Sequence, residues 1–437
     1  MATITAGRIT SPHPCARRER CLSLGYSLSS ISKPVTSASS STARNVVLAT
    51  FATQAVVTMS NSTLPTIAPK LAEVMAMDAA LIGYQASILF GGAVAGTLFG
   101  GSFTRRYGAC RTLQTSLAFS GTGVLMMILP SVLAIVAGSL IAGFGQGILN
   151  SATAHLLVKY TPTSRRNLLF SIKQSGVPFG GMLVALTAPA IALTAGWQWA
   201  IVCVAVLIAL LLALVQPARA QWDDDRDPHA DLSQQKFGGV PLVFHEPALR
   251  WISFAGLLFA GMQRALATFV VIYLVAERGY TLIEAGVMLS VLHAGGISGR
   301  LAWGWIADRY SSTAVLLAVA AISVGCTFAL TALEADWPRA AVYALFFVFG
   351  SAALGWNGVL HAETARLSPP GMASVVAGGS TFFVFGGVLI GPSVFAAAYS
   401  LLGSYSATLI LLAVASAAGG VMVVLARHAA PARRRAA

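Results

Sequence analysis

The feature that most constrains this chain is a series of twelve apolar runs, each long enough to cross about 30 Å of hydrocarbon as a helix. They fall near 46–68, 79–103, 110–129, 131–158, 167–194, 197–216, 249–275, 282–306, 313–333, 339–365, 372–399 and 403–426. The runs are continuous rather than alternating, and lipid admits only helices or closed barrels. The sequence therefore predicts an all-α membrane protein with twelve transmembrane helices in two six-helix halves.

The charge distribution agrees with a bilayer environment. Only 10% of the residues are charged and 56% are hydrophobic, whereas a soluble domain carries about 25% charged residues. Most of the net charge of +13 lies in residues 1–44 and in the arginines that follow residue 426. Basic ends favour the cytoplasmic side of a membrane and give no reason to expect nucleic acid. The five cysteines show no C-x-x-C pairing, so neither a disulfide nor a metal site is expected.

The chain divides into five predicted regions. These are a tail over 1–44, a six-helix half over 45–216, a cytoplasmic linker over 217–245, a second half over 246–427 and a basic tail over 428–437. The first tail is rich in serine and resembles an organelle transit sequence, but a disordered tail or a start assigned too far upstream is favoured. In the linker, Asp223, Asp224, Asp225, Asp227 and His229 could hold a metal, but a solvated charge run is the preferred interpretation.

Orientation follows from the basic residues near the span ends. The turns after the second and fourth spans carry Arg105, Arg106, Arg111, Lys159, Arg165 and Arg166, whereas the turns after odd-numbered spans carry only Lys70, Arg278 and Arg339. This asymmetry predicts that both termini are cytoplasmic. The alanine-rich, lysine-poor composition favours a bacterial cytoplasmic (inner) membrane over an organelle membrane.

The two halves repeat short sequences at a nearly constant offset. "GSFTRRYGA" begins at Gly101 and "GWIADRYSS" at Gly304, and His155 and His361 correspond at a similar spacing. A duplicated six-helix unit in parallel orientation predicts a binding site between the halves near the membrane midplane.

With its long central linker and its G-x-x-x-D-R-x-G-type loops, the chain resembles the major facilitator superfamily over roughly 45–427. The resemblance implies alternating access, with a loop aspartate that faces a helix N-terminus of the other half when the cytoplasmic side closes. Asp308 suits this role, and Arg105 has the wrong charge. We expect Arg105 to pair with an acid or a lipid headgroup, or simply to extend towards the headgroups. The predicted gating residues are Gly101, Arg105, Arg106, Gly304, Asp308 and Arg309.

Glycines spaced four residues apart occur in the second, fifth, eighth and eleventh spans. They are Gly92, Gly96 and Gly100, Gly176 and Gly180, Gly295 and Gly299, and Gly387 and Gly391. Small residues at this spacing let helices approach closely in lipid, so packing and gating are the preferred interpretation. The resemblance implies that spans 2 and 11 meet, as do spans 5 and 8.

Polar residues inside spans are costly and indicate function. Arg264 lies about sixteen residues into the seventh span, mirrors Asn61 of the first, and has no acidic residue at comparable depth. A guanidinium in that place needs an anionic partner, which a substrate could supply; pairing with backbone carbonyls or extension to the headgroups is the alternative. Lys173 could be a second positive group or reach the headgroups. Asn150 and Asn357 are candidate substrate contacts or interhelical hydrogen bonds.

Proton coupling requires a titratable group whose exposure changes during transport. The usual mid-membrane carboxylate is missing here. The order of preference is therefore His293, then His361 or Glu363, then His155, although each can also be an ordinary buried polar residue.

No enzyme motif is present, since the chain lacks G-x-x-x-x-G-K-[ST], H-E-x-x-H and G-x-S-x-G. The sequence thus predicts a secondary transporter without a cofactor, working as a monomer in the lipid bilayer. The favoured substrate is a small organic anion, a carboxylate, moved together with protons. The alternative is efflux of amphipathic compounds by proton antiport.

Overall fold

The computed structural model describes residues 40–161, 166–230, 232, 239–334, 336–369 and 372–430, and within them the chain forms helices and no strand. The first half contains α2 (Ser40–Thr66), α3 (Ala68–Met75), α4 (Ile82–Tyr107), α5 (Ala109–Met126), α6 (Val132–Tyr160), α7 (Arg166–Thr194) and α8 (Trp197–Val215). The linker region contains α9 (Arg219–Trp222) and α10 (Gly239–His245). The second half contains α11 (Pro247–Arg278), α12 (Leu282–Arg309), α13 (Ser312–Thr331), α14 (Arg339–Gly355), α15 (Asn357–Leu367), α16 (Ala373–Leu402) and α17 (Tyr405–Ala429).

Every predicted span coincides with a helix. In the described ranges, ten helical segments are long and apolar enough to cross a membrane. The other two predicted spans correspond to α2 and α5, which carry polar residues such as Gln54, Asn61 and Gln114. The span expected over 339–365 is divided at Trp356 into α14 and α15. Most of the tail expected over 1–44 lies outside the described residues, but α2 already begins at Ser40.

Local sequence signals set the helix ends. Thr281 and Glu284 form a capping box at the start of α12, each bonding the backbone N–H of the other. Gly279 and Gly403 take left-handed backbone conformations after α11 and α16, which a residue without Cβ adopts readily. Gly108, at φ 95°, makes the one-residue turn between α4 and α5. These signals produce short connections between antiparallel neighbours.

Glycines bring helices of each half into backbone contact in the same way. A Cβ at Gly143 of α6 would lie 1.8 Å from the carbonyl oxygen of Leu89 on α4. In the second half, a Cβ at Gly350 of α14 would lie 1.9 Å from that of Leu292 on α12. This correspondence supports two halves with the same arrangement of helices.

The predicted glycine series pack against helices of their own half, not against helices of the other half. Those of α4 face α6, those of α7 face α2, those of α12 face α14 and those of α16 face α11. The resemblance pointed instead to contacts between spans 2 and 11 and between spans 5 and 8. Those pairs, α4 with α16 and α7 with α12, do meet, but not through these glycines.

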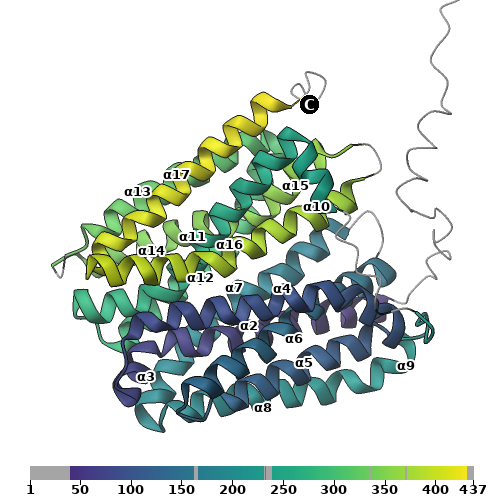
Figure 1. The fold of residues 1–437 in the computed structure, drawn as a ribbon, viewed down its shortest axis with the longest axis horizontal. Helices are drawn as coiled ribbons and strands as arrows, with labels where there is room; N and C mark the ends of the chain where they lie inside the picture. The colour runs from purple at the N-terminus through teal and green to yellow at the C-terminus, as the bar shows by residue number, and fades with distance from the viewer. Residues whose placement is uncertain are drawn as a thin grey trace, which may run out of the picture.

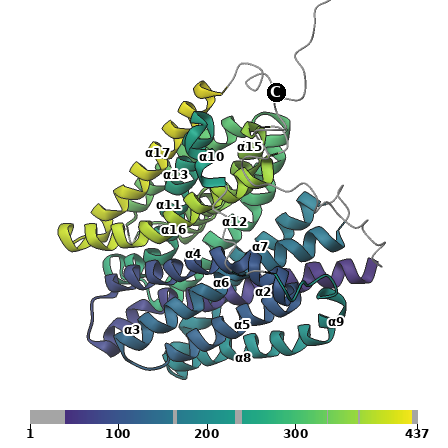
Figure 2. The ribbon, with the colours of Figure 1, turned by 45° about the vertical axis from the view of Figure 1, so that its right-hand side comes forward.

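The two halves are joined closely at one end of the molecule. We call the end where α4, α6 and α8 finish the linker end, and the other the opposite end. Figures 1 and 2 show the purple-to-teal bundle and the green-to-yellow bundle diverging towards α10, at the linker end. At the opposite end, a Cβ at Gly83 would lie 2.7 Å from the carbonyl oxygen of Pro392, and one at Gly286 would lie 2.4 Å from that of Ala185.

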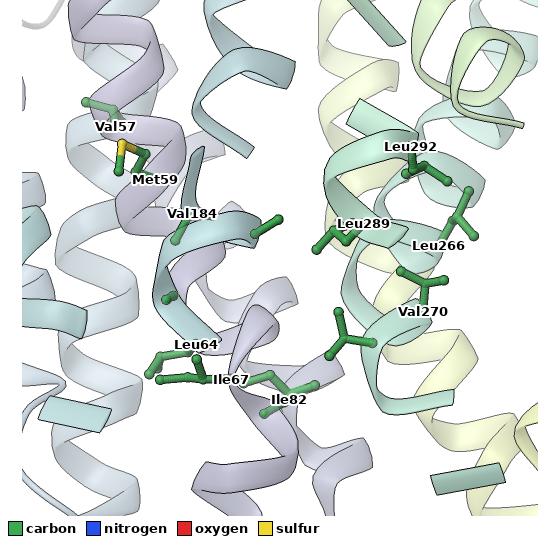
Figure 3. Packing of buried hydrophobic residues seen from close by; sticks show 14 of the residues in the cluster. Val57, Met59, Leu64, Ile67, Ile82, Val184, Leu266, Val270, Leu289 and Leu292 are labelled. Atoms are coloured by element: carbon green, nitrogen blue, oxygen red, sulfur yellow. The ribbon is translucent and has the colours of Figure 1, made fainter. Parts of the chain in front are cut away.

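The apolar core follows the same division. One buried cluster includes residues of both halves; Figure 3 shows Ile67 and Ile82 of the first half and Val270 and Leu289 of the second among its members. A second cluster contains only residues of α10 and the second half, from Val243 onwards, at the linker end. The cores of the two halves therefore merge at the opposite end and are separate at the linker end.

The acidic run of the linker docks on the first half. The Asp223 carboxylate accepts hydrogen bonds from the backbone N–H groups of Cys110 (2.6 Å) and Arg111 (3.2 Å), at the start of α5, where a negative charge stabilises a helix. Asp225 accepts from Lys159 at 2.8 Å. Asp223 is only 7% exposed, so it is not part of a solvated run as predicted. In the described part of the chain no three His, Cys, Asp or Glu residues are placed to hold a metal ion.

Candidate anion-binding site

Polar side chains from five helices gather where the two halves meet. We call Asn61, Gln146, Asn150, Lys173, Arg264 and Arg300 the interhalf cluster. They come from α2, α6, α7, α11 and α12. Both arginines of the second half donate to backbone carbonyl groups of the first half, Arg264 to Asn61 and Arg300 to Gln174.

Arg264 lies in the middle of α11, as predicted. Its Nη2 donates to the carbonyl oxygen of Asn61 at 3.2 Å, and its guanidinium lies 5.1 Å from the ring centroid of Phe90. Its Nε is buried and has no hydrogen-bond partner in the part of the chain that the structure describes. The Asn61 side chain donates from Nδ2 to Oε1 of Gln146 at 3.1 Å. Among the described residues no carboxylate lies within 4.0 Å of Arg264, which leaves its charge uncompensated.

Lys173 and Arg300 form a second group nearer the linker end. The Lys173 side chain is 5% exposed, and its Nζ donates to Oδ1 of Asn150 and Oε1 of Gln174, both at 3.1 Å. Arg300 donates from Nη1 to the carbonyl oxygen of Gln174 at 2.5 Å and from Nε to that of Leu354 at 3.1 Å. All four acceptors are neutral. Like Arg264, neither side chain forms an ion pair with a described carboxylate.

Arg300 is the residue that the sequence interpretation missed. It lies inside the predicted span 282–306, so the argument applied to Arg264 could have found it. Its partner Gln174 also went unused in the prediction, although it is adjacent to Lys173. Arg300 and Lys173 both donate to Gln174, which places the two positive groups close together.

His293 lies at the contact between α12 and α7. The residue is 7% exposed, and its Nδ1 is buried without a hydrogen-bond partner among the described residues. The ring occupies the space next to Gly181 of the other half, where a Cβ would lie 2.4 Å from Cε1. A change in the distance between the halves would therefore change the surroundings of this imidazole.

Three of the four remaining predicted residues, Asn357, Glu363 and His155, have partners of their own. Asn357 donates from Nδ2 to Oε1 of Gln263 at 3.3 Å. Glu363 is buried and pairs with Arg366 at 2.6 Å. His155 pairs with Asp225 at 2.7 Å in an exposed position. His361 is half-buried on α15.

The two repeated segments, predicted as loops, are mostly helical in this structure, because 101–107 forms the end of α4 and 304–309 forms the end of α12. A Cβ at Gly101 or at Gly304 would have no atom of the described residues within 4 Å. Arg105 and Asp308 are exposed, and neither forms an ion pair with a described residue. The backbone carbonyl of Arg105 accepts from the N–H of Asp227 at 2.8 Å. Arg106 lies 5.8 Å from the ring centroid of Tyr107, and Arg309 is exposed.

Comparisons with known proteins identify relatives over most of the chain. The family model described as Major Facilitator Superfamily matches residues 47–392. An uncharacterised MFS-type transporter of Mycobacterium tuberculosis (strain CDC 1551 / Oshkosh) is 26% identical over 236 residues, 53% of this chain. The chain spans about half the length of that relative, 51%.

Two other relatives are covered more fully. The hexuronate transporter of Bacillus subtilis (strain 168) is 24% identical over 334 residues, 71% of this chain and 78% of the relative. The gentisate transporter of Corynebacterium glutamicum is 24% identical over 329 residues, 72% of this chain and 71% of the relative. In fold, the chain is similar to a bacterial homologue of the human lysosomal transporter Spinster, with TM-score 0.65 and 14% identity, covering 90% of this chain and 99% of that one.

Proposed function

The chain belongs to the Major Facilitator Superfamily, and on this basis we propose that it is a secondary transporter of a small organic anion, with a carboxylate bound at Arg264. Alternating access would expose this group first to one side of the membrane and then to the other. The proposal includes a functional monomer in a bacterial cytoplasmic membrane with both termini in the cytoplasm. The basic linker end supports that orientation.

The observation that carries the proposal is the uncompensated charge of Arg264. Four of its five N–H donors have no acceptor in the described part of the chain, and a planar guanidinium matches a carboxylate. Lys173 and Arg300 bring further positive charge, and the acceptors of their hydrogen bonds in the described part of the chain are neutral. An anion that enters between the halves would meet donors that the protein leaves unused.

The names of the relatives support an organic acid as substrate. The relatives from Bacillus subtilis and Corynebacterium glutamicum are named for hexuronate and gentisate. The alternative, proton-antiport efflux of amphipathic compounds, would be favoured by an acid facing the cluster. In the described spans, Glu277 bonds Ser406, Glu284 pairs with Arg339 and Glu363 with Arg366, so none of these acids serves that purpose.

Proton coupling is assigned to His293 in this proposal. Its unpartnered Nδ1 and its position against the other half give it a protonation site whose surroundings depend on the state of the transporter. The variant His293→Gln would then lose accumulation driven by a pH gradient but keep exchange of substrate across the membrane. Loss of both activities in a folded variant would remove His293 from this role.

Ligand-induced thermal stabilisation tests the proposed substrate class. Purified protein would be heated with glucuronate, benzoate, acetate, phosphate or tetraphenylphosphonium. A ligand at 100 times its Kd stabilises the folded state by about 2.7 kcal/mol. We expect a carboxylate to raise the melting temperature of the parent and of Arg250→Gln, a control on α11 whose arginine stacks on Trp251, but not of Arg264→Gln. Stabilisation by tetraphenylphosphonium alone would favour the exporter instead.

A further inference from the structure

The interhalf cluster has two levels that are separated by one turn of α6. Gln146 belongs to the upper level, because its Oε1 accepts from the side chain of Asn61, whose backbone carbonyl accepts from Arg264. Asn150 belongs to the lower level, because it accepts from Lys173. Residues four apart lie on the same face of a helix, one above the other and about 6 Å apart along the axis. The two levels are therefore neighbours along the expected transport direction.

Each level holds positive charge and unused donors. At the upper level, within the described ranges, Arg264 forms one hydrogen bond and its buried Nε has no partner. At the lower level, Arg300 uses two of its five N–H donors and Lys173 two of its three. Because the lower acceptors are carbonyl and amide oxygens, the charges of Lys173 and Arg300 also lack a counter-charge among the described residues.

Charge balance between the levels limits what the cluster can hold. A monocarboxylate bound at Arg264 would leave Lys173 and Arg300 uncompensated, and the two lie close together because both donate to Gln174. Like charges in a region with little water are costly. A second acidic group on the same ligand, one helical turn from the first, would offset that repulsion.

We infer that the substrate is a dicarboxylate whose first carboxylate binds Arg264 and whose second binds between Lys173 and Arg300. This inference rests on the proposed function and narrows the organic anion to one with two acidic groups. Arg300 is then the residue that distinguishes dianions from monoanions. Its existing bond to Gln174 of the other half orients the guanidinium at the lower level.

Isothermal titration calorimetry on the full chain in lipid nanodiscs tests this inference. The probes are malonate, succinate, glutarate and adipate, each beside its monoamide, which keeps the shape and removes one charge. Charge-assisted hydrogen bonds are among the stronger ones, so at least one dicarboxylate should bind about tenfold or more tightly than its monoamide. In Arg300→Gln that difference should disappear, while the affinity for the monoamide stays within about twofold.

Controls separate this inference from the proposed function. Arg250→Gln, outside the interhalf cluster, should keep the full preference for the dicarboxylate. Lys173→Gln should weaken the preference as well, and it provides a second test if Arg300→Gln fails to fold. Equal binding of dicarboxylate and monoamide to the parent, or equal losses for both in Arg300→Gln, would overturn the inference but leave a monoanion transporter. If none of the acids binds, the proposed function fails too.

Discussion

Arg264 illustrates how single charged residues are balanced in this molecule. Removing a guanidinium from water costs several kcal/mol unless it is paired. The contact with Phe90 offsets about 0.5–2 kcal/mol of this, and the bond to the carbonyl oxygen of Asn61 adds about 1 kcal/mol. These terms do not cover the cost, so water or a ligand must provide the remainder. Glu363, by contrast, is buried against Arg366 and needs no further partner.

A comparison of Asp308 with Arg105 tests the proposed role of Asp308 in closing the linker end. The family resemblance gives Asp308 a partner at a helix N-terminus of the other half once the linker end closes, and no such role to Arg105. Both side chains are exposed in this structure. We expect Asp308→Asn to lower the initial rate of uptake into proteoliposomes about tenfold or more, because it removes one charge-assisted contact of about 1.5–3 kcal/mol. Arg105→Asn should stay within about twofold. Equal effects would contradict a gating role specific to Asp308.

At the scale of helices, close packing depends on glycines that face a neighbouring backbone. The contacts of α6 on α4 and of α14 on α12 leave no space for even a methyl group. In lipid there is little hydrophobic gain from helix association, so close van der Waals contact carries more of the stability. The glycine series could be predicted from spacing alone, but their partner helices could not, because spacing marks a face and not what lies against it.

Gly143→Ala should therefore destabilise the protein. The added methyl group would lie 1.8 Å from the carbonyl oxygen of Leu89, so α4 and α6 must separate. Overpacking of this kind costs about 1–3 kcal/mol, and we expect a melting temperature lower by several degrees in thermal unfolding. The matched variant is Gly325→Ala on α13, where nothing lies within 4 Å. It should be neutral or slightly stabilising because alanine favours helix. Similar behaviour of both variants would refute this explanation.

The docked linker predicts a dependence on pH. Burial raises the pKa of the Asp225 carboxyl, but hydrogen bonds and positive charge from Lys159 and His155 outweigh it, so its pKa lies below the ordinary value of 3.8. A lowered pKa in the folded state means that Asp225 adds stability above pH 3.8 and that this is lost as the pH falls through the folded-state pKa. Since the side chain is 40% exposed, the contribution is at most about 1 kcal/mol.

Melting temperatures of parent and Asp225→Asn should accordingly differ by a small amount near pH 5 and converge at lower pH. Asp224→Asn is the more exposed comparison and should have a smaller effect. A difference that persists unchanged at the acid end would mean that the charge of Asp225 does not contribute.

At the scale of the whole molecule, the sequence predicts where the helices lie along the chain better than it predicts which residues of different helices contact one another. Continuous apolar runs identify the twelve spans, because lipid leaves few other backbone solutions. The break at Trp356, the burial of Asp223 at the start of α5 and the bond between Arg300 and Gln174 were not predicted. The last two depend on residues that are far apart in sequence and meet only after the helices pack. Arg264 could be predicted because depth within one span is a local property.

The joined opposite end leads to a prediction about the whole molecule. A side chain at Gly83 would meet the Phe269 ring at 2.5 Å and the carbonyl oxygen of Pro392 at 2.7 Å, so Gly83→Leu should force the halves apart there. If the halves rock as rigid bodies, the linker end should close in response. Spin labels on cysteines at Tyr107 and Tyr310, both exposed at the linker end, would report this in double electron–electron resonance on a chain otherwise free of cysteine. Gly83→Leu should add a population at shorter distance, whereas Gly325→Leu, in open space on α13, should reproduce the parent distribution. An unchanged distribution in a folded Gly83→Leu protein would show that the two ends are not mechanically coupled.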